Sequence, residues 1–346
     1  MSEQSIAKRL APRALGTRFV EWMTGGEHAT ISMSLLRILY GGAIVWFLIV
    51  SAADRHYLWG AGSRWVDPIV DLRHWPAVFT VLFSKDDPAL FDLAYGALIA
   101  LAFLFTVGFA TRIVTPLLLL FWVGLSSNSV FLTNGGDLVI RITLLFLVFA
   151  NLSRHRSVDA WLHARGVGPW RSGLRRWIPE WALAAAHNTA LVLCAYQIML
   201  IYVTSGIFKL QGTEWLEGSA LYYALNLEVF RVFPALSDLV WQVTPFVLVG
   251  SWASIWAQLL FPVLMLWRPT RYAALAVILS MHLGIGLFLG LWPFSIAMIA
   301  LDLLFVRDAS WQRAFAASRA FAGSVRDAFA ERRRPAPSSP ASKVNG

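Results

Sequence analysis

The chain has 346 residues, of which 58% are hydrophobic and only 14% are charged, and its formal net charge is +9. Soluble globular domains carry about 25% charged residues, so this composition excludes an ordinary water-soluble globule and predicts a membrane protein. The positive charge is interpreted as a topology signal and an attraction to anionic membrane lipids. We therefore expect membrane lipids as partners and no nucleic acid.

Windows of about 20 apolar residues, the length of a helix that crosses the hydrocarbon core, recur along the chain. Lipid offers the backbone no hydrogen-bond partners, so each window predicts a helix. The predicted fold is all-α, a polytopic bundle of about eight transmembrane helices. The expected spans are 33–53, 91–110, 113–132, 137–152, 186–208, 244–267, 271–290 and 293–306.

The distribution of Lys and Arg predicts the orientation of this bundle. With a cytoplasmic N-terminus, 21 basic residues fall on the cytoplasmic side and six on the outer side. Residues 1–32 carry charges and lack a continuous apolar core, so the first span is expected to direct insertion in place of a cleavable signal peptide. We expect a multi-pass protein of a bacterial inner or plasma membrane, with both termini in the cytoplasm.

The remaining segments complete the predicted organisation. Residues 1–32 form a cytoplasmic N-terminal segment and residues 33–306 the transmembrane domain. Within that domain we expect an outer-face cap at 54–90, a cytoplasmic loop at 151–185 and an outer-face loop at 209–243. Residues 307–333 predict a basic amphipathic interfacial helix, because Trp311, Phe315 and Phe329 share one face with arginines beside it. The composition of residues 334–346 predicts disorder.

The cysteine and ionisable side chains restrict the chemistry. Cys194 is the sole cysteine, which excludes an intrachain disulfide and favours a buried structural thiol. We predict no metal site. Arg37, one turn into the first span, is interpreted chiefly as an arginine that snorkels to the interface. The polar residues Asn128, Gln197, Gln258 and Asp302 are interpreted as interhelical hydrogen-bonding groups.

A polar turn precedes the fourth span. Asp137 and Arg141 are four residues apart and can pair along one helix face. They follow Asn134, Gly135 and Gly136, and such a turn can expose backbone N–H groups to a ligand. A structural ion pair and a binding site both remain open.

Two further ionisable residues lie in the same outer layer as Asp137. His282 is either a packing residue or a group that accepts and relays a proton. Lys209 ends the fifth span at its outer side. It either snorkels to the interface or points inward, where desolvation favours the free amine that can remove a proton.

Four stretches carry a resemblance to the HTTM family, the transmembrane domain shared by bacterial membrane proteins and vitamin K-dependent gamma-glutamyl carboxylase. They are SLLRILYGG, TNGGDLVIRITLLFLVFANLSRHRSVDAW, YVTSGIFKLQGTEWLEGSALYY and MHLGIGLFLGLWPFSIAM, and the likeness covers roughly residues 30 to 306. The resemblance implies that Lys209 is an amine base acting on a reduced, vitamin K-like quinone, with His282 as a supporting residue.

Two features depart from the carboxylase pattern. The carboxylases have a histidine after an Asn pair, where this chain reads Asn134-Gly135-Gly136-Asp137. The chain also ends soon after the eighth span, without the large extramembrane domain that binds the protein substrate. A reduced or different chemistry is therefore an open expectation.

Two hypotheses follow. The first is a carboxylase-like membrane enzyme that binds a quinone-type lipid at the outer side, with Lys209 as base and Trp215, Tyr222 and Tyr223 lining the approach. The second is a non-catalytic maturation or scaffold factor, similar to the HTTM component of a bacterial sporulation-delaying toxin system, that works with partner proteins on a secreted peptide.

Overall fold

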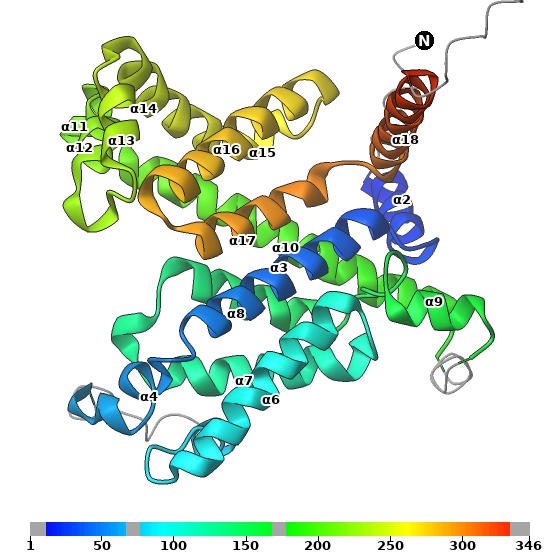
Figure 1. Ribbon diagram of the computed structural model, residues 1–346. Helices are drawn as coiled ribbons and strands as arrows, with labels where there is room; N and C mark the ends of the chain where they lie inside the picture. The colour runs from blue at the N-terminus through cyan, green and yellow to red at the C-terminus, as the bar shows by residue number, and fades with distance from the viewer. Residues whose placement is uncertain (1–11, 67–76, 168–177, 333–346) are drawn as a thin grey trace, which may run out of the picture. The chain divides into compact units, whose positions relative to one another are not determined.

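The computed structural model describes residues 12–66, 77–167 and 178–332. All regular secondary structure within these ranges is helical (Figure 1). The chain divides into two units after Val306. Parts of the expected outer cap and cytoplasmic loop, at 67–76 and 168–177, lie outside the described residues, as does the tail at 334–346.

Four helices are long and apolar enough to cross a membrane. They correspond to the first, second, fifth and seventh expected spans, and they confirm a helical membrane protein. Their bounds are α3 (Thr30–Val50), α6 (Pro88–Val107), α10 (Glu180–Lys209) and α16 (Arg268–Leu289).

The other four expected spans correspond to shorter helices, so the count of eight crossings stays a prediction. These helices are α7 (Thr111–Ser127), α8 (Gly135–Leu147), α14 (Thr244–Leu259) and α17 (Trp292–Asp302), the last continued by η6 (Leu303–Phe305). A bend of 91° separates α14 from α13 (Pro234–Trp241), and the two together would make a fifth candidate span.

Short helices fill the connections. Before α3 lies α2 (Pro12–Thr24), and between α3 and α6 lie α4 (Arg55–Leu58), η1 (Ala61–Val66) and α5 (Ala77–Val81). Later connections contain η3 (Val130–Leu132), α9 (Val158–Ala164), α11 (Thr213–Leu216), α12 (Ala220–Asn226), η5 (Glu228–Phe230) and α15 (Phe261–Leu264).

Helix α3 is central to the first unit. It packs against α6 on one side and α17 on another, while α10 packs against α8 and α14. Leu36, Tyr40 and Ile44 of α3 are buried in one continuous apolar core with Leu98 and Phe105 of α6. The same interior holds the Tyr202, His282 and Asp302 side chains described below, so their hydrogen bonds form away from solvent.

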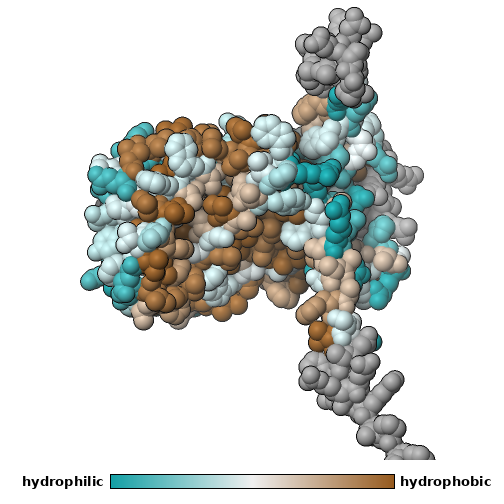
Figure 2. Space-filling model, turned by 90° about the horizontal axis from the view of Figure 1, so that it is seen from above, coloured by the Kyte–Doolittle hydropathy of each residue, from teal (hydrophilic) through white to brown (hydrophobic). Residues whose placement is uncertain are grey.

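The outside of the first unit is also apolar. Large hydrophobic side chains on the candidate spans are exposed, including Leu93 at 71% and Phe208 at 70%. Hydrophobic residues cover the broad middle of the face in Figure 2, and hydrophilic residues gather at its left-hand end, where Figure 1 places α11–α13. An apolar exterior of this extent is expected of a surface that faces lipid.

The snorkelling interpretation of Arg37 is wrong. Its side chain is completely buried, and the guanidinium donates to four backbone carbonyls from distant segments. Nε lies 3.1 Å from Leu152 O, Nη1 lies 2.9 Å from Phe105 O and 2.5 Å from Thr106 O, and Nη2 lies 2.8 Å from Arg156 O. The contacts with Leu152 O and Phe105 O are buried and those with Thr106 O and Arg156 O are partly buried, so Arg37 connects the end of α6, where carbonyls lack partners within their own helix, to the segment after α8.

A polar cluster joins the segment between α2 and α3 to the loop after α8. The Glu27 carboxylate accepts from Asn151 Nδ2, 2.9 Å from each oxygen, and from Arg154 Nη1 at 2.8 Å. Burial raises the pKa of Glu27, but the hydrogen bonds from Asn151 and Arg154 outweigh burial and leave the pKa below its ordinary value. The cluster therefore holds an ionised carboxylate.

The second unit contains helix α18 (Asp308–Arg332). Its Trp311 and Phe315 rings stack at 5.8 Å, as expected for residues four apart on one helix face. Its placement at a membrane interface stays a prediction.

Candidate functional site

Lys209 is the last residue of α10, and its amine faces other parts of the protein. Nζ donates to Gln258 Oε1 of α14 at 2.6 Å and lies 4.6 Å from the centroid of the Trp215 ring in α11. The side chain is half-buried. These contacts favour the inward-pointing alternative over an amine that snorkels away from the protein.

A glycine allows this arrangement. Gly206 lies one turn before Lys209, and a Cβ there would be 2.9 Å from Leu259 Cβ and 3.0 Å from Leu259 N. Because any side chain at position 206 would collide with α14, glycine lets the two helices approach closely. That approach places Gln258 within reach of the lysine.

A second polar group lies in the interior between α10, α16 and α17. Tyr202 Oη is 3.0 Å from His282 Nε2, and it donates to Asp302 Oδ1 at 3.0 Å and Oδ2 at 2.9 Å. All three side chains are at most 1% exposed. We call these three residues the interior triad. Among the residues that the structure describes, buried His282 Nδ1 has no hydrogen-bond partner.

Aromatic rings surround the triad. Phe261 meets Tyr202 edge-on at 4.8 Å, and Phe294 meets His282 edge-on at 5.6 Å. Tyr202 and Lys209 lie seven residues apart in α10 and so share one side of that helix.

The turn before α8 is satisfied internally. Asn134 Oδ1 accepts from the N–H groups of Gly136 at 2.7 Å and Asp137 at 3.2 Å, and Asp137 Oδ2 accepts from Asn134 N at 3.0 Å. This is a capping box, and it uses the donors that we expected a ligand to use. Arg141 is within electrostatic range of Asp137.

The turn nevertheless lies beside the interior triad. A Cβ on Gly136 would be 3.0 Å from Phe294 Cα, and Phe294 also contacts His282. On its other side, Asp137 lines a cavity of about 10 Å³ together with Trp59, Trp122 and Thr133, which is room for about one water molecule.

Tyr222 and Tyr223 do not join Lys209. They are 39% and 55% exposed, and their rings contact each other at 5.4 Å. Tyr222 also meets Trp241 of α13 at 5.3 Å. Of the three aromatic residues expected to line the approach, only Trp215 contacts the lysine.

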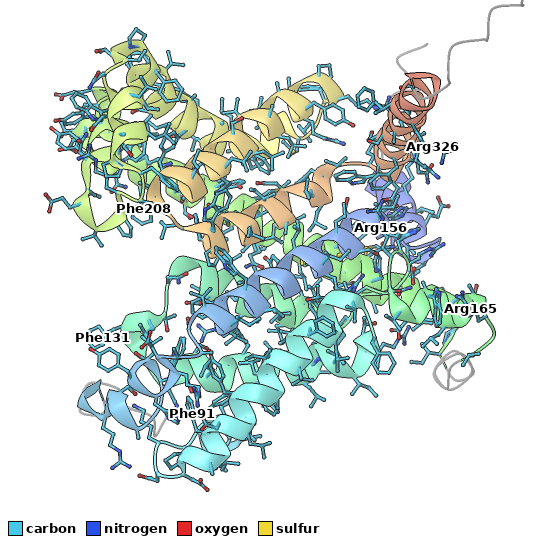
Figure 3. The ribbon with its side chains drawn as sticks, viewed as in Figure 1. Phe91, Phe131, Arg156, Arg165, Phe208 and Arg326 are labelled. Atoms are coloured by element: carbon cyan, nitrogen blue, oxygen red, sulfur yellow. The ribbon has the colours of Figure 1, made fainter. Side chains whose placement is uncertain are left out.

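Sequence reasoning missed Tyr202. Its position held a usable signal, because Tyr202, Gly206 and Lys209 follow the i, i+4, i+7 spacing of a single helix face. Figure 3 labels Phe208, the exposed neighbour of Lys209 in α10. Gln258 and Asp302 were expected to bond between helices, and they bond to Lys209 and Tyr202.

Comparison with known proteins gives the family. The chain is 29% identical over 115 residues to "Uncharacterized protein YitO" of Bacillus subtilis (strain 168), a match that covers 32% of this chain and 37% of that protein. No solved structure matches significantly. The HTTM domain family matches residues 27–311, which is most of the chain. The chain therefore belongs to the HTTM domain family.

Proposed function

We propose that this HTTM protein is a multi-pass enzyme of the bacterial cell membrane, carboxylase-like, in which Lys209 is the amine base for a reduced quinone-type lipid. The observation that carries the proposal is the direction of Lys209. Its amine bonds to Gln258 and lies over Trp215, although a lysine at a helix end could reach water instead.

The residues around Lys209 fit a hydroquinone. A neutral amine that donates one N–H to Gln258 keeps its lone pair, so Lys209 can accept the proton of a hydroxyl group. Trp215 offers a flat apolar surface beside that amine, and His282 Nδ1, which has no partner within the described part of the chain, offers another polar atom in the interior. A bound reduced quinone would supply the electrons for reaction with molecular oxygen.

Each side chain has a defined part in this proposal. Gln258 fixes the direction of the amine. Trp215 keeps bulk water from one side of it, which protects the free base from competing proton donors. Lys209 receives the proton and becomes an ammonium, which must lose that proton before the next turnover.

The direct experiment measures consumption of vitamin K1 hydroquinone in air by the protein in lipid nanodiscs. We expect the wild type to exceed the protein-free rate, and Lys209→Ala to lower the excess by about 10²–10⁴-fold, the usual contribution of a positioned base. Lys209→Arg should fail as well, because a guanidinium is not deprotonated in proteins.

Lys85→Ala is the matched control, because Lys85 lies outside this site with its Nζ 3.5 Å from Ser63 O. It should retain the full rate. Full activity of Lys209→Arg, or a wild-type rate equal to the protein-free rate, would refute the base role.

A scaffold role is the second candidate, and the segment from 210 to 243 favours it. This segment exposes large hydrophobic side chains, among them Val229 at 89% and Tyr223 at 55%, as a surface that receives a peptide would. Under this role a photo-crosslinker at Val229 captures a specific secreted peptide, and removal of quinones from the membrane leaves the capture unchanged.

A further inference from the structure

The interior triad raises a question of proton placement. Tyr202 has one hydroxyl proton, yet its oxygen lies within hydrogen-bond distance of both the Asp302 carboxyl and His282 Nε2. Only one of these neighbours can receive that proton, and the other must donate a proton to the Tyr202 oxygen. The same heavy-atom distances therefore suit two arrangements.

In the first arrangement Asp302 is ionised, Tyr202 donates to it, and His282 donates from Nε2. The other ring nitrogen, Nδ1, then carries a bare lone pair. In the second arrangement Asp302 carries a proton and donates to Tyr202, and Tyr202 donates to Nε2. Nδ1 then carries the ring proton, because a neutral imidazole has one N–H.

The two arrangements differ by one proton, which enters and leaves at His282 Nδ1. A proton that binds Nδ1 allows Nε2 to pass its own proton to Tyr202, and Tyr202 to pass its proton to Asp302. One N–H bond forms and one breaks on the histidine, one O–H bond forms and one breaks on the tyrosine, and one O–H bond forms on the carboxyl. No electrons move.

Charge favours the arrangement with protonated Asp302. The carboxyl is completely buried, and within the described residues its hydrogen bonds come from Tyr202 alone, with no cation paired to it. A buried carboxylate without a cation is costly. A neutral triad avoids that cost.

We infer that Asp302, Tyr202 and His282 form a proton relay with its open end at His282 Nδ1, and that the relay is loaded in the resting protein, with its extra proton on the Asp302 carboxyl. When Nδ1 gives up its proton to a base, Nε2 takes the proton of Tyr202 and Tyr202 takes that of Asp302, so the relay delivers one proton at Nδ1. Tyr202 and Asp302 are positioning residues in this scheme, because they act through His282.

Infrared spectroscopy of the resting protein tests the relay without any substrate. We expect a carboxylic acid C=O band that shifts in D₂O and is lost in Asp302→Asn. Tyr202→Phe should move the band, because the carboxyl loses its partner. Tyr40→Phe is the matched control, since Tyr40 is equally buried and bonds to Thr143 instead, and it should leave the band in place.

Three results would overturn the relay: no such band in the wild type, a band that survives Asp302→Asn, or a band unmoved by Tyr202→Phe.

Discussion

Replacing Arg37 with methionine tests whether the buried guanidinium organises one end of the bundle. Methionine keeps much of the length and apolar volume of the arginine stem, so the change removes the donors without opening a large cavity. Four backbone carbonyls, from the end of α6 and the segment after α8, lose the hydrogen bond from the guanidinium, although Phe105 O still accepts from Gly108 N at 3.1 Å.

The size of the effect follows from two opposing terms. A hydrogen bond to a charged group contributes about 1.5–3 kcal/mol, so four such bonds alone would suggest a very large loss. Removing the guanidinium also removes the cost of burying a charge. Each buried carbonyl left without a partner costs about 1–3 kcal/mol, so with the charge itself gone the expected net loss is about 2–4 kcal/mol, a large share of the 5–15 kcal/mol that typically stabilises a protein.

The assay is reversible unfolding in mixed micelles, followed by tryptophan fluorescence. Arg55→Met is the matched control. Arg55 pairs with Asp92 at 2.6 Å in a partly exposed ion pair, and exposed pairs contribute less than about 1 kcal/mol. A loss below about 1 kcal/mol for Arg37→Met would show that the four carbonyl contacts do not stabilise the fold.

Two further predictions concern other parts of the first unit. The lowered pKa of Glu27 means that its hydrogen bonds with Asn151 and Arg154 stabilise the fold above about pH 4.5, and that this stabilisation is lost as the pH falls through the folded-state pKa. The thermal midpoints of wild type and Glu27→Gln should therefore differ at neutral pH and converge in acid. A difference that stays constant with pH would contradict this. Gly206→Ala should destabilise the protein by about 1–3 kcal/mol, because the new Cβ would press on the backbone of α14. Gly42→Ala is the control and should not destabilise it, because the space around a Cβ at position 42 is open. Equal unfolding curves for the two variants would refute the close contact between α10 and α14.

The helices could be predicted because the physical rule behind them is local. A long apolar segment in lipid must satisfy its own backbone, so composition alone identifies α3, α6, α10 and α16. The lengths of α7 and α8 could not be predicted in this way, because a helix packed among other helices can end early. Other segments then donate hydrogen bonds to the free carbonyls of that helix, as Arg37 does at the end of α6.

The site was predictable only in part, for the same reason. Lys209 and His282 stand out because ionisable residues are rare in apolar helices. Their partners do not stand out, because Tyr202 and Asp302 are 100 residues apart in the chain and meet only when α10 and α17 pack together. The closed capping box at Asn134 likewise depends on local geometry that the Gly-Gly pair did not reveal.

The central claim is that the Lys209 amine points into the protein in the native membrane. The rate at which a water-soluble reagent acetylates that amine tests the claim. Membranes are treated with sulfo-NHS acetate, and acetylation of Lys209 is followed by peptide mass spectrometry in folded protein and in protein unfolded in SDS. We predict that folding slows acetylation strongly and that Gln258→Leu, which removes the partner of the amine, restores part of the rate. Equal rates in folded and unfolded wild type would place the amine in bulk water and contradict the account.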